Sequence, residues 1–69
     1  MKKINIKFGD KMVVVNEKTT LEEFLNNQKV DTRNLATSVN TELILKDKRK
    51  DKVLNEMDHI NIFGPITGG

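Results

Sequence analysis

Two runs of alternating apolar and polar residues stand near opposite ends of the chain, and they constrain the fold more than any other feature. In the first run Ile4, Ile6 and Phe8 alternate with polar residues, and in the second run Ile60 and Ile62 do so. This period of two predicts strands that each bury one face. A chain of 69 residues has room for only one small core. We therefore expect both strands to lie side by side and parallel in one sheet.

An amphipathic helix is predicted between these two strands. Thr20 and Glu23 carry the capping-box pattern, in which each side chain accepts a hydrogen bond from an otherwise unpaired backbone amide. The apolar stripe of the helix comprises Leu21, Phe24, Leu25 and Gln28. Residues 26–29 are weak helix formers and should end the helix. We expect this helix to cover one face of the sheet.

Gly9-Asp10 follows the first strand and is interpreted as a two-residue hairpin turn, because glycine suits the first position of a type II′ turn. The turn would set Phe8 opposite Lys11, Ile6 opposite Val13 and Ile4 opposite Val15. Val13 and Val15 would then face the core. A loop one residue longer would bury Met12 and Val14 instead, and we expect the shorter loop.

The middle of the chain predicts two short strands, at residues 35–39 and 42–45, joined at Asn40-Thr41. Asn tolerates a positive φ, whereas a β-branched Thr does not, so we expect a turn wider than two residues. The charged run 46–52 is predicted to be a solvated loop outside the core, with Val53 and Leu54 packed beneath it. An alternative role for this run is an electrostatic docking patch for an acidic partner or nucleic acid.

The composition argues against several classes of function. Twelve basic and ten acidic residues give a net charge of only +2, which does not argue for nucleic-acid binding, and the absence of Trp and Tyr leaves no platform for stacked bases. There is no cysteine, hence no thiol nucleophile and no cysteine metal site. No metal-ligand spacing or phosphate-binding loop is present, and the single His59 is assigned no role.

No apolar segment follows Met1-Lys2-Lys3, so we expect a soluble, cytoplasmic protein with no membrane contact.

The last six residues read as an extended segment that ends in two small residues. Gly64-Pro65 stops regular structure, and proline biases both itself and the preceding residue toward extended conformations. Gly68 and Gly69 lack a Cβ and therefore fit a narrow channel. Between these pairs, Ile66 offers an apolar anchor and Thr67 a strand-like hydrogen bond at a partner's sheet edge.

Taken together, the element order and several short motifs resemble the ubiquitin-like sulfur-carrier proteins. The motifs are Val39-Asn40 before a strand, the stretch 58–62 after Leu54, and the final Gly68-Gly69. Residues 63–69 look like the Phe-Pro-Pro-Val-x-Gly-Gly ending of the small subunit of molybdopterin synthase. The length and the short middle section look more like the sulfur carrier of thiamine biosynthesis. The family often has Asn-Gly in place of Asn40-Thr41, and Gly-Asp in place of Met57-Asp58.

This resemblance implies an α+β, β-grasp (ubiquitin-like) fold, with a mixed sheet of four to five strands covered on one face by one main helix. Residues 1–63 would form the domain and residues 64–69 a flexible, reactive C-terminal tail. Phe63 would mark the exit of the tail and is a candidate docking residue. The tail residues that would fit a partner's channel are Gly64, Pro65, Ile66, Thr67 and Gly68.

The resemblance also implies a chemistry centred on Gly69. An ATP-using, ubiquitin-activating-like adenylyltransferase would adenylate its carboxylate, and sulfur from a donor such as a cysteine desulfurase would convert it to a thiocarboxylate. A thiazole synthase or the large subunit of molybdopterin synthase would accept the sulfur. The chain itself would be a co-substrate rather than an enzyme, would bind no cofactor and would be a monomer when free.

Three functions therefore stay open from the sequence. The first is a sulfur carrier, with thiazole formation for thiamine slightly ahead of molybdenum or tungsten pterin synthesis. The second is a ubiquitin-like modifier that is conjugated to lysines through Gly69. The third is a small basic nucleic-acid binder in which the tail has no role.

Overall fold

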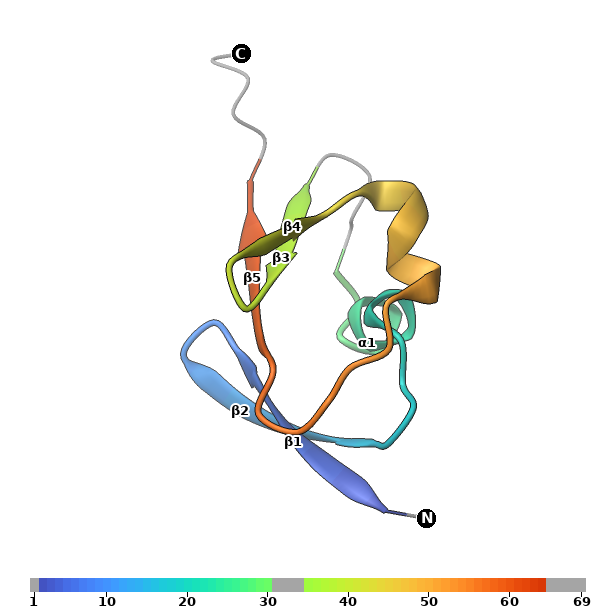
Figure 1. The fold of residues 1–69 in the computed structure, drawn as a ribbon. Helices are drawn as coiled ribbons and strands as arrows, with labels where there is room; N and C mark the ends of the chain where they lie inside the picture. Colours follow the sequence, from blue (N-terminus) through green and yellow to red (C-terminus); the bar gives the residue numbers. More distant parts are fainter. Residues whose placement is uncertain (1, 31–34, 65–69) are drawn as a thin grey trace.

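The computed structural model describes residues 2–30 and 35–64, which form a five-stranded sheet in the order β2-β1-β5-β3-β4 (Figure 1). The strands are β1 (Lys3–Phe8), β2 (Lys11–Asn16), β3 (Ala36–Val39), β4 (Glu42–Ile44) and β5 (His59–Phe63). β1 and β5 pair in parallel, while β1–β2, β3–β4 and β3–β5 pair antiparallel. The predicted parallel pairing of the first and last strands is thus confirmed, and β5 is the central strand of a mixed sheet.

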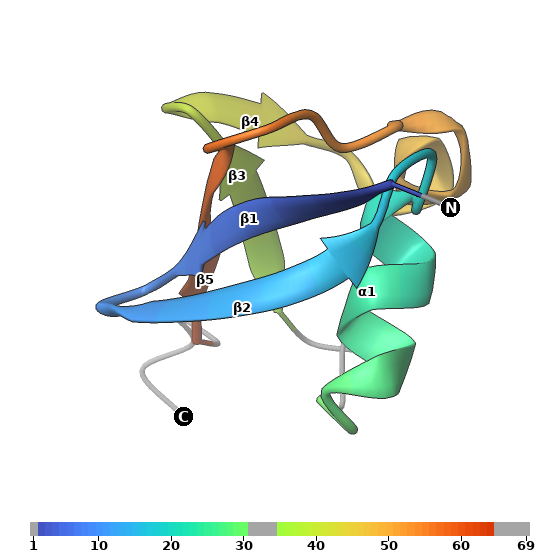
Figure 2. The same cartoon turned by 90° about the horizontal axis from the view of Figure 1, so that it is seen from below.

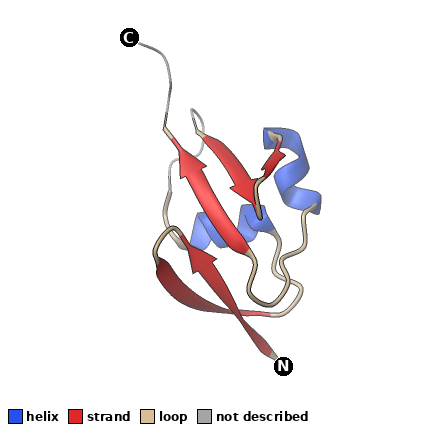
Figure 3. Cartoon of the chain, turned by 60° about the vertical axis from the view of Figure 1, so that its left-hand side comes forward, coloured by secondary structure: helices blue, strands red, loops and turns tan. Residues whose placement is uncertain are grey.

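One α-helix, α1 (Leu21–Asn27), and one 3₁₀-helix, η1 (Lys46–Asp51), lie on the same side of this sheet (Figures 2 and 3). The capping box at the start of α1 is present: Glu23 N donates to Thr20 Oγ1 at 3.2 Å, and Thr20 N donates to Glu23 Oε1 at 2.9 Å. The predicted helix and its start are therefore confirmed. No helix among residues 2–30 and 35–64 is long and apolar enough to cross a membrane.

The core lies between the sheet and α1. Its buried apolar side chains are Ile6, Leu21, Phe24, Leu25, Val39, Ile44, Leu54 and Ile60. Phe8 packs edge-to-face on Phe24, with ring centroids 5.1 Å apart and an interplanar angle of 88°, a geometry that aromatic pairs favour. The period-two pattern of the terminal strands and the stripe of the helix therefore meet in one core. This packing leaves the other face of the sheet uncovered by either of the two described helices, and we call it the open face.

The first hairpin has the predicted register. Phe8 pairs with Lys11, Ile6 with Val13 and Ile4 with Val15. Gly9 has a φ of +63°, as the first position of a type II′ turn requires. The shorter loop is thus confirmed: Val13 and Val15 pack against the core, while Met12 and Val14 are exposed.

The turn between β3 and β4 is tighter than predicted. Val39 pairs with Glu42, so only Asn40 and Thr41 connect the strands, with φ values of 51° and 72°. A two-residue turn with positive φ at both positions matches the twist of the flanking strands. The pairing of β3 with β4 therefore holds Thr41 at a positive φ, although a β-branched residue prefers a negative one. The expectation of a wider turn is wrong.

The charged run was also predicted incorrectly in part. It forms η1 rather than an irregular loop, and Arg49 within it is buried. Arg49 Nε donates to Thr37 Oγ1 at 3.1 Å, and its Nη2 donates to the Leu35 carbonyl at 2.6 Å. Acceptors on and beside β3 thus compensate the burial of this guanidinium. The run therefore contributes one side chain to the interior.

Only one of the two apolar residues after η1 packs inside. Leu54 is buried as predicted, whereas Val53 is exposed. Val53 forms an isolated antiparallel bridge with Thr20. In extended backbone, adjacent side chains point to opposite sides, so only one of the pair can face the core.

Candidate functional site

The candidate site is the end of β5, from which the C-terminal segment leaves the domain. On one side β5 is held by β3 along its whole length, from Val39↔Ile60 to Ala36↔Phe63. On the other side the parallel pairing with β1 stops at Phe8↔Ile60. The central strand of the sheet therefore fixes the exit point. Beyond Ile60, however, no described strand pairs with β5 on the side of β1, and we call this side the free flank.

The free flank follows from the hydrogen-bond pattern. Asn40 N donates to the His59 carbonyl at 2.8 Å, which makes residues 59, 61 and 63 the ones that bond toward β3. The backbone groups of Ile60 and Ile62 therefore point toward β1, and Gly9 N indeed donates to the Ile60 carbonyl at 2.9 Å. Among the described residues, no backbone hydrogen bond reaches Ile62 from that side.

The turn at Gly9 explains why the β1–β5 pairing ends there. In a continued parallel ladder, the Gly9 carbonyl would accept the Ile62 amide hydrogen. Gly9 instead enters the hairpin with its positive φ, and its carbonyl lies 3.1 Å from His59 Nε2. His59 thus has a structural contact, and it occupies the acceptor that Ile62 would otherwise use.

The start of β5 is held by hydrogen bonds among the buried Asp58, the half-buried His59 and the exposed Asn40 and Asn55. Asn40 Nδ2 donates to Asp58 Oδ1 at 2.8 Å, and His59 N donates to Asn40 Oδ1 at 2.9 Å. The other oxygen of Asp58 accepts from Asn55 N at 2.7 Å. Asp58 is buried, so these bonds replace the water that its carboxylate loses. These hydrogen bonds, which we call the clamp, fix the position of His59 opposite Asn40. They thereby set the register of β5 against β3, which places Phe63 at the end of the pairing.

A second polar contact joins β1 to the segment before β5. Glu56 accepts hydrogen bonds at 3.0 Å from both Asn5 N and Asn5 Nδ2. The backbone hydrogen bond first, and the side-chain bond second, lower the pKa of Glu56 from its ordinary value. Asn5 in turn accepts from Met57 N at 2.7 Å, and Met57 holds a positive φ of 65°. Met57 thus adopts a backbone conformation that glycine would adopt with less strain.

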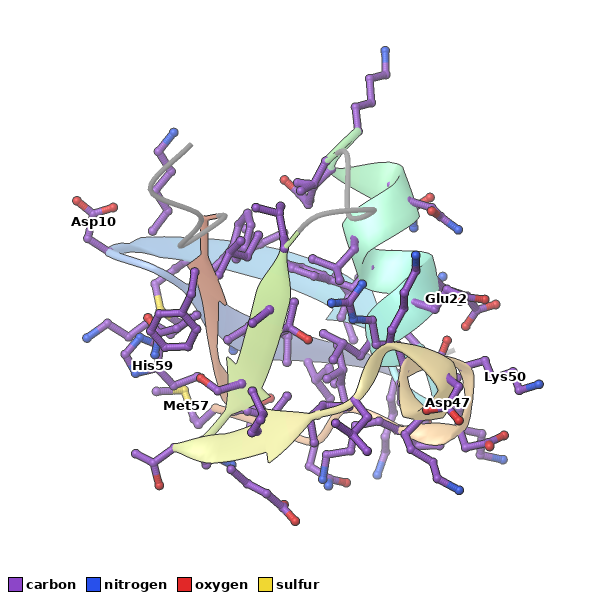
Figure 4. All side chains as sticks on the ribbon, turned by 90° about the horizontal axis from the view of Figure 1, so that it is seen from above. Asp10, Glu22, Asp47, Lys50, Met57 and His59 are labelled. Atoms are coloured by element: carbon purple, nitrogen blue, oxygen red, sulfur yellow. The ribbon has the colours of Figure 1, made fainter. Side chains whose placement is uncertain are left out.

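The open face carries exposed apolar side chains on both sides of the exit. The cross-strand register places Met12, Lys7 and His59 in one row and Leu43, Ser38 and Asn61 in another. Figure 4 shows Met57 and His59 on the side of the sheet opposite Glu22 and Lys50. Phe63, at the exit itself, is 47% exposed. The apolar side chains of this face therefore lie near its edges, and the polar side chains of the two rows lie between them.

The structure places two of the residues predicted for the tail. Phe63 ends β5 with an exposed ring, and Gly64 follows with open space around it. The other predicted tail residues lie outside the described residues: Pro65, Ile66, Thr67, Gly68 and Gly69. The assignment of residues 64–69 to a reactive tail therefore stays a prediction.

Two features of the exit were missed from the sequence. Leu43 is exposed on the open face, and the only signal was that Leu43, Ile44 and Leu45 cannot all face inward from one strand. The free flank at Ile62 depends on where β1 stops, which is a property of the sheet rather than of β5. In residues 2–30 and 35–64 there is neither a pocket nor a cluster of three side chains suited to a metal.

Comparison with known proteins gives a consistent picture. The model of the ThiS family matches residues 2–69. The crystal structure of the thiamine biosynthesis protein ThiS from Geobacter metallireducens superposes with a TM-score of 0.82; the match covers 96% of this chain and 100% of that one at 19% identity. No curated protein matches the chain significantly. The structural likeness shows a shared fold, and the family match extends to the last residue of the chain.

Proposed function

This chain belongs to the ThiS family of ubiquitin-like sulfur carriers, and from that premise we propose that it carries sulfur as a thiocarboxylate on Gly69 for thiazole formation in thiamine biosynthesis. The observation that carries the proposal is the family match through Gly68-Gly69. The position of Phe63 at the end of the central strand supports it, because a substrate tail needs a fixed point of departure.

The chemistry requires activation, because a carboxylate is a poor electrophile. A partner adenylyltransferase would join the Gly69 carboxylate to the AMP part of ATP, with release of pyrophosphate. A persulfide on a donor protein would then displace AMP and form an acyl disulfide that links Gly69 to the donor. A thiol from another molecule, since this chain has no cysteine, would attack the donor's sulfur, which releases the Gly69 thiocarboxylate and leaves the donor in a disulfide with that thiol. The described residues offer no pocket for ATP, so we assign nucleotide binding and catalysis to the partner. This chain would serve as a co-substrate.

The tail has the properties that this chemistry needs. The five residues after Gly64 span at most about 18 Å when extended, at roughly 3.6 Å each, which would let Gly69 enter a buried active site while the domain stays outside. Glycines at the end fit a narrow channel because they lack a Cβ. Pro65 limits the conformations that the base of the tail can adopt.

The experiment is an intact-mass measurement. The chain is incubated with ATP, its activating enzyme and a sulfur donor, and we expect the mass increase of one oxygen-to-sulfur exchange. Deletion of Gly69 should abolish the increase although Gly68 still supplies a carboxylate, because the reactive group no longer reaches the active site. Lys48→Ala, an exposed change in η1, serves as the control and should be converted like the wild type. Lysine conjugates without a sulfur gain would favour the modifier function.

A second candidate acceptor follows from the tail sequence. Residues 63–69 resemble the ending of the small subunit of molybdopterin synthase, which favours pterin synthesis as the alternative pathway. The thiocarboxylate form should be offered separately to a thiazole synthase and to the large subunit of molybdopterin synthase. Sulfur transfer only to the pterin enzyme would contradict the thiamine assignment and retain the carrier function.

A further inference from the structure

We infer that the free flank of β5, at Ile62 and Gly64, is a strand-addition site at which an extended segment of the activating enzyme pairs with the chain. The inference rests on the proposed function, since it names the surface by which the same partner holds the tail. The flank is the side of β5 that β1 leaves uncovered beyond Phe8↔Ile60.

The donors and acceptors needed for such pairing are present. The alternation along β5 directs the N–H and C=O groups of Ile62 away from β3, and none of the described residues bonds to them through the backbone. Ile62 is only partly buried, so water can satisfy these groups in the free chain. An unpaired row of backbone groups at a sheet edge is a template for another strand.

The same flank continues past the strand. Gly64 follows Ile62 by two residues, so its amide has the same orientation if the extended backbone is maintained. Apart from its chain neighbours, no atom of the described residues lies within 4 Å of the position that a Cβ at Gly64 would take. A partner segment can therefore approach residues 62 and 64 without displacing any described part of the domain.

The reach of the tail selects the occupant. For Gly69 to react, the active site must lie within about 18 Å of Gly64, so the wall of the enzyme's channel must run along the tail from its base. The exposed Phe63 ring, between the two flank residues in sequence, points to the open face and offers an apolar anchor. Backbone pairing combined with a side-chain pocket is how extended segments are recognised by strand addition. Reach restricts the occupant to an enzyme that acts on Gly69, and of these we assign the flank to the activating enzyme, because it must bind the chain before any sulfur can be transferred.

The test uses two variants at Gly64. Gly64→Pro removes the amide hydrogen of residue 64. A proline also restricts the residue before it to an extended backbone, but Phe63 already has that conformation in β5. Gly64→Ala keeps the amide hydrogen, and its methyl group has room. In adenylation by the cognate enzyme, we expect the KM of Gly64→Pro to be about fivefold above that of Gly64→Ala, as for one net hydrogen bond, with equal kcat values. Lys48→Ala, which lies outside the flank and the tail, should keep the wild-type KM within about twofold.

A direct readout is amide hydrogen exchange of the full-length chain with and without the activating enzyme. We expect the Ile62 amide to exchange much faster than those of Asn61 and Phe63 in the free chain, and to become protected in the complex. Equal KM values for the two variants, or an Ile62 amide that still exchanges quickly in the complex, would overturn the inference. Protection in the free chain that grows with its concentration would assign the flank to a second copy and overturn it as well. Absence of wild-type adenylation would instead reject the proposed function.

Discussion

Asn40 and Asp58 are joined by a 2.8 Å hydrogen bond that ties the β3–β4 turn to the start of the central strand. Because His59 N also donates to Asn40, a single amide side chain bonds both the residue before β5 and the first residue of β5. The two residues are 18 positions apart, so their contact closes a long loop. It fixes the register from which Phe63 and the exit position follow.

Replacing Asp58 with Ala should destabilise the domain by about 2 kcal/mol, because the Asn40 amide and Asn55 N–H both lose their acceptor near the protein interior. This is a large fraction of the roughly 3–10 kcal/mol expected for a chain of this length. Urea unfolding checks the value. Asn40→Gly serves as a companion variant, since it keeps the positive φ and loses only the side-chain bonds. Wild-type stability in both variants would show that the clamp contributes nothing.

The turn that contains Asn40 can be improved at its second position. Thr41 has a φ of 72°, which costs a β-branched residue about 1–2 kcal/mol, whereas glycine adopts it freely. Part of that gain is offset by the greater freedom of glycine in the unfolded chain. We expect Thr41→Gly to raise the unfolding free energy by about 0.5–1 kcal/mol, measured as a higher urea midpoint at unchanged slope. Leu45→Gly, at a φ of −65°, is the control and should lower it.

Replacement of the buried Arg49 should destabilise the domain, in contrast to the change at Thr41. Arg49→Ala should cost about 2–4 kcal/mol, because the substitution removes the buried stem and leaves Thr37 Oγ1 and the Leu35 carbonyl without this donor. Lys50→Ala, the exposed neighbour in η1, should change stability by less than about 0.5 kcal/mol. Thermal unfolding of both variants checks the difference. Equal small effects would mean that the run 46–52 is solvated throughout.

The contrast between Arg49 and its neighbours shows what the sequence could predict. The strand pattern, the capping box and the hairpin register were all predicted correctly, because each depends on residues close together in the chain. Arg49 could not be distinguished from the surrounding lysines, since its acceptors at Leu35 and Thr37 come from another element. The positive φ at Thr41 was likewise imposed by the pairing of β3 with β4.

In the candidate site, too, one feature was predictable from the sequence and another was not. Phe63 was identified as the last strand residue because Gly64-Pro65, directly after it, stops regular structure. The free flank at Ile62 was not predictable, because it depends on the early end of β1 at the Gly9 turn. The length of one strand thus decides which groups of another are available to a partner.

Acid should weaken the contact between Glu56 and Asn5. The folded-state pKa of Glu56 lies below its ordinary value, mainly because its carboxylate accepts the Asn5 backbone hydrogen bond. A carboxyl group with a lowered folded-state pKa stabilises the fold above its unfolded pKa, and it loses that contribution as pH falls through the folded-state value. Below pH 4.5, the ordinary pKa of a glutamate side chain, the stability difference between the wild type and Glu56→Gln should therefore shrink. Urea unfolding from pH 7 to pH 3 measures it, and a difference that grows toward low pH would contradict the assignment.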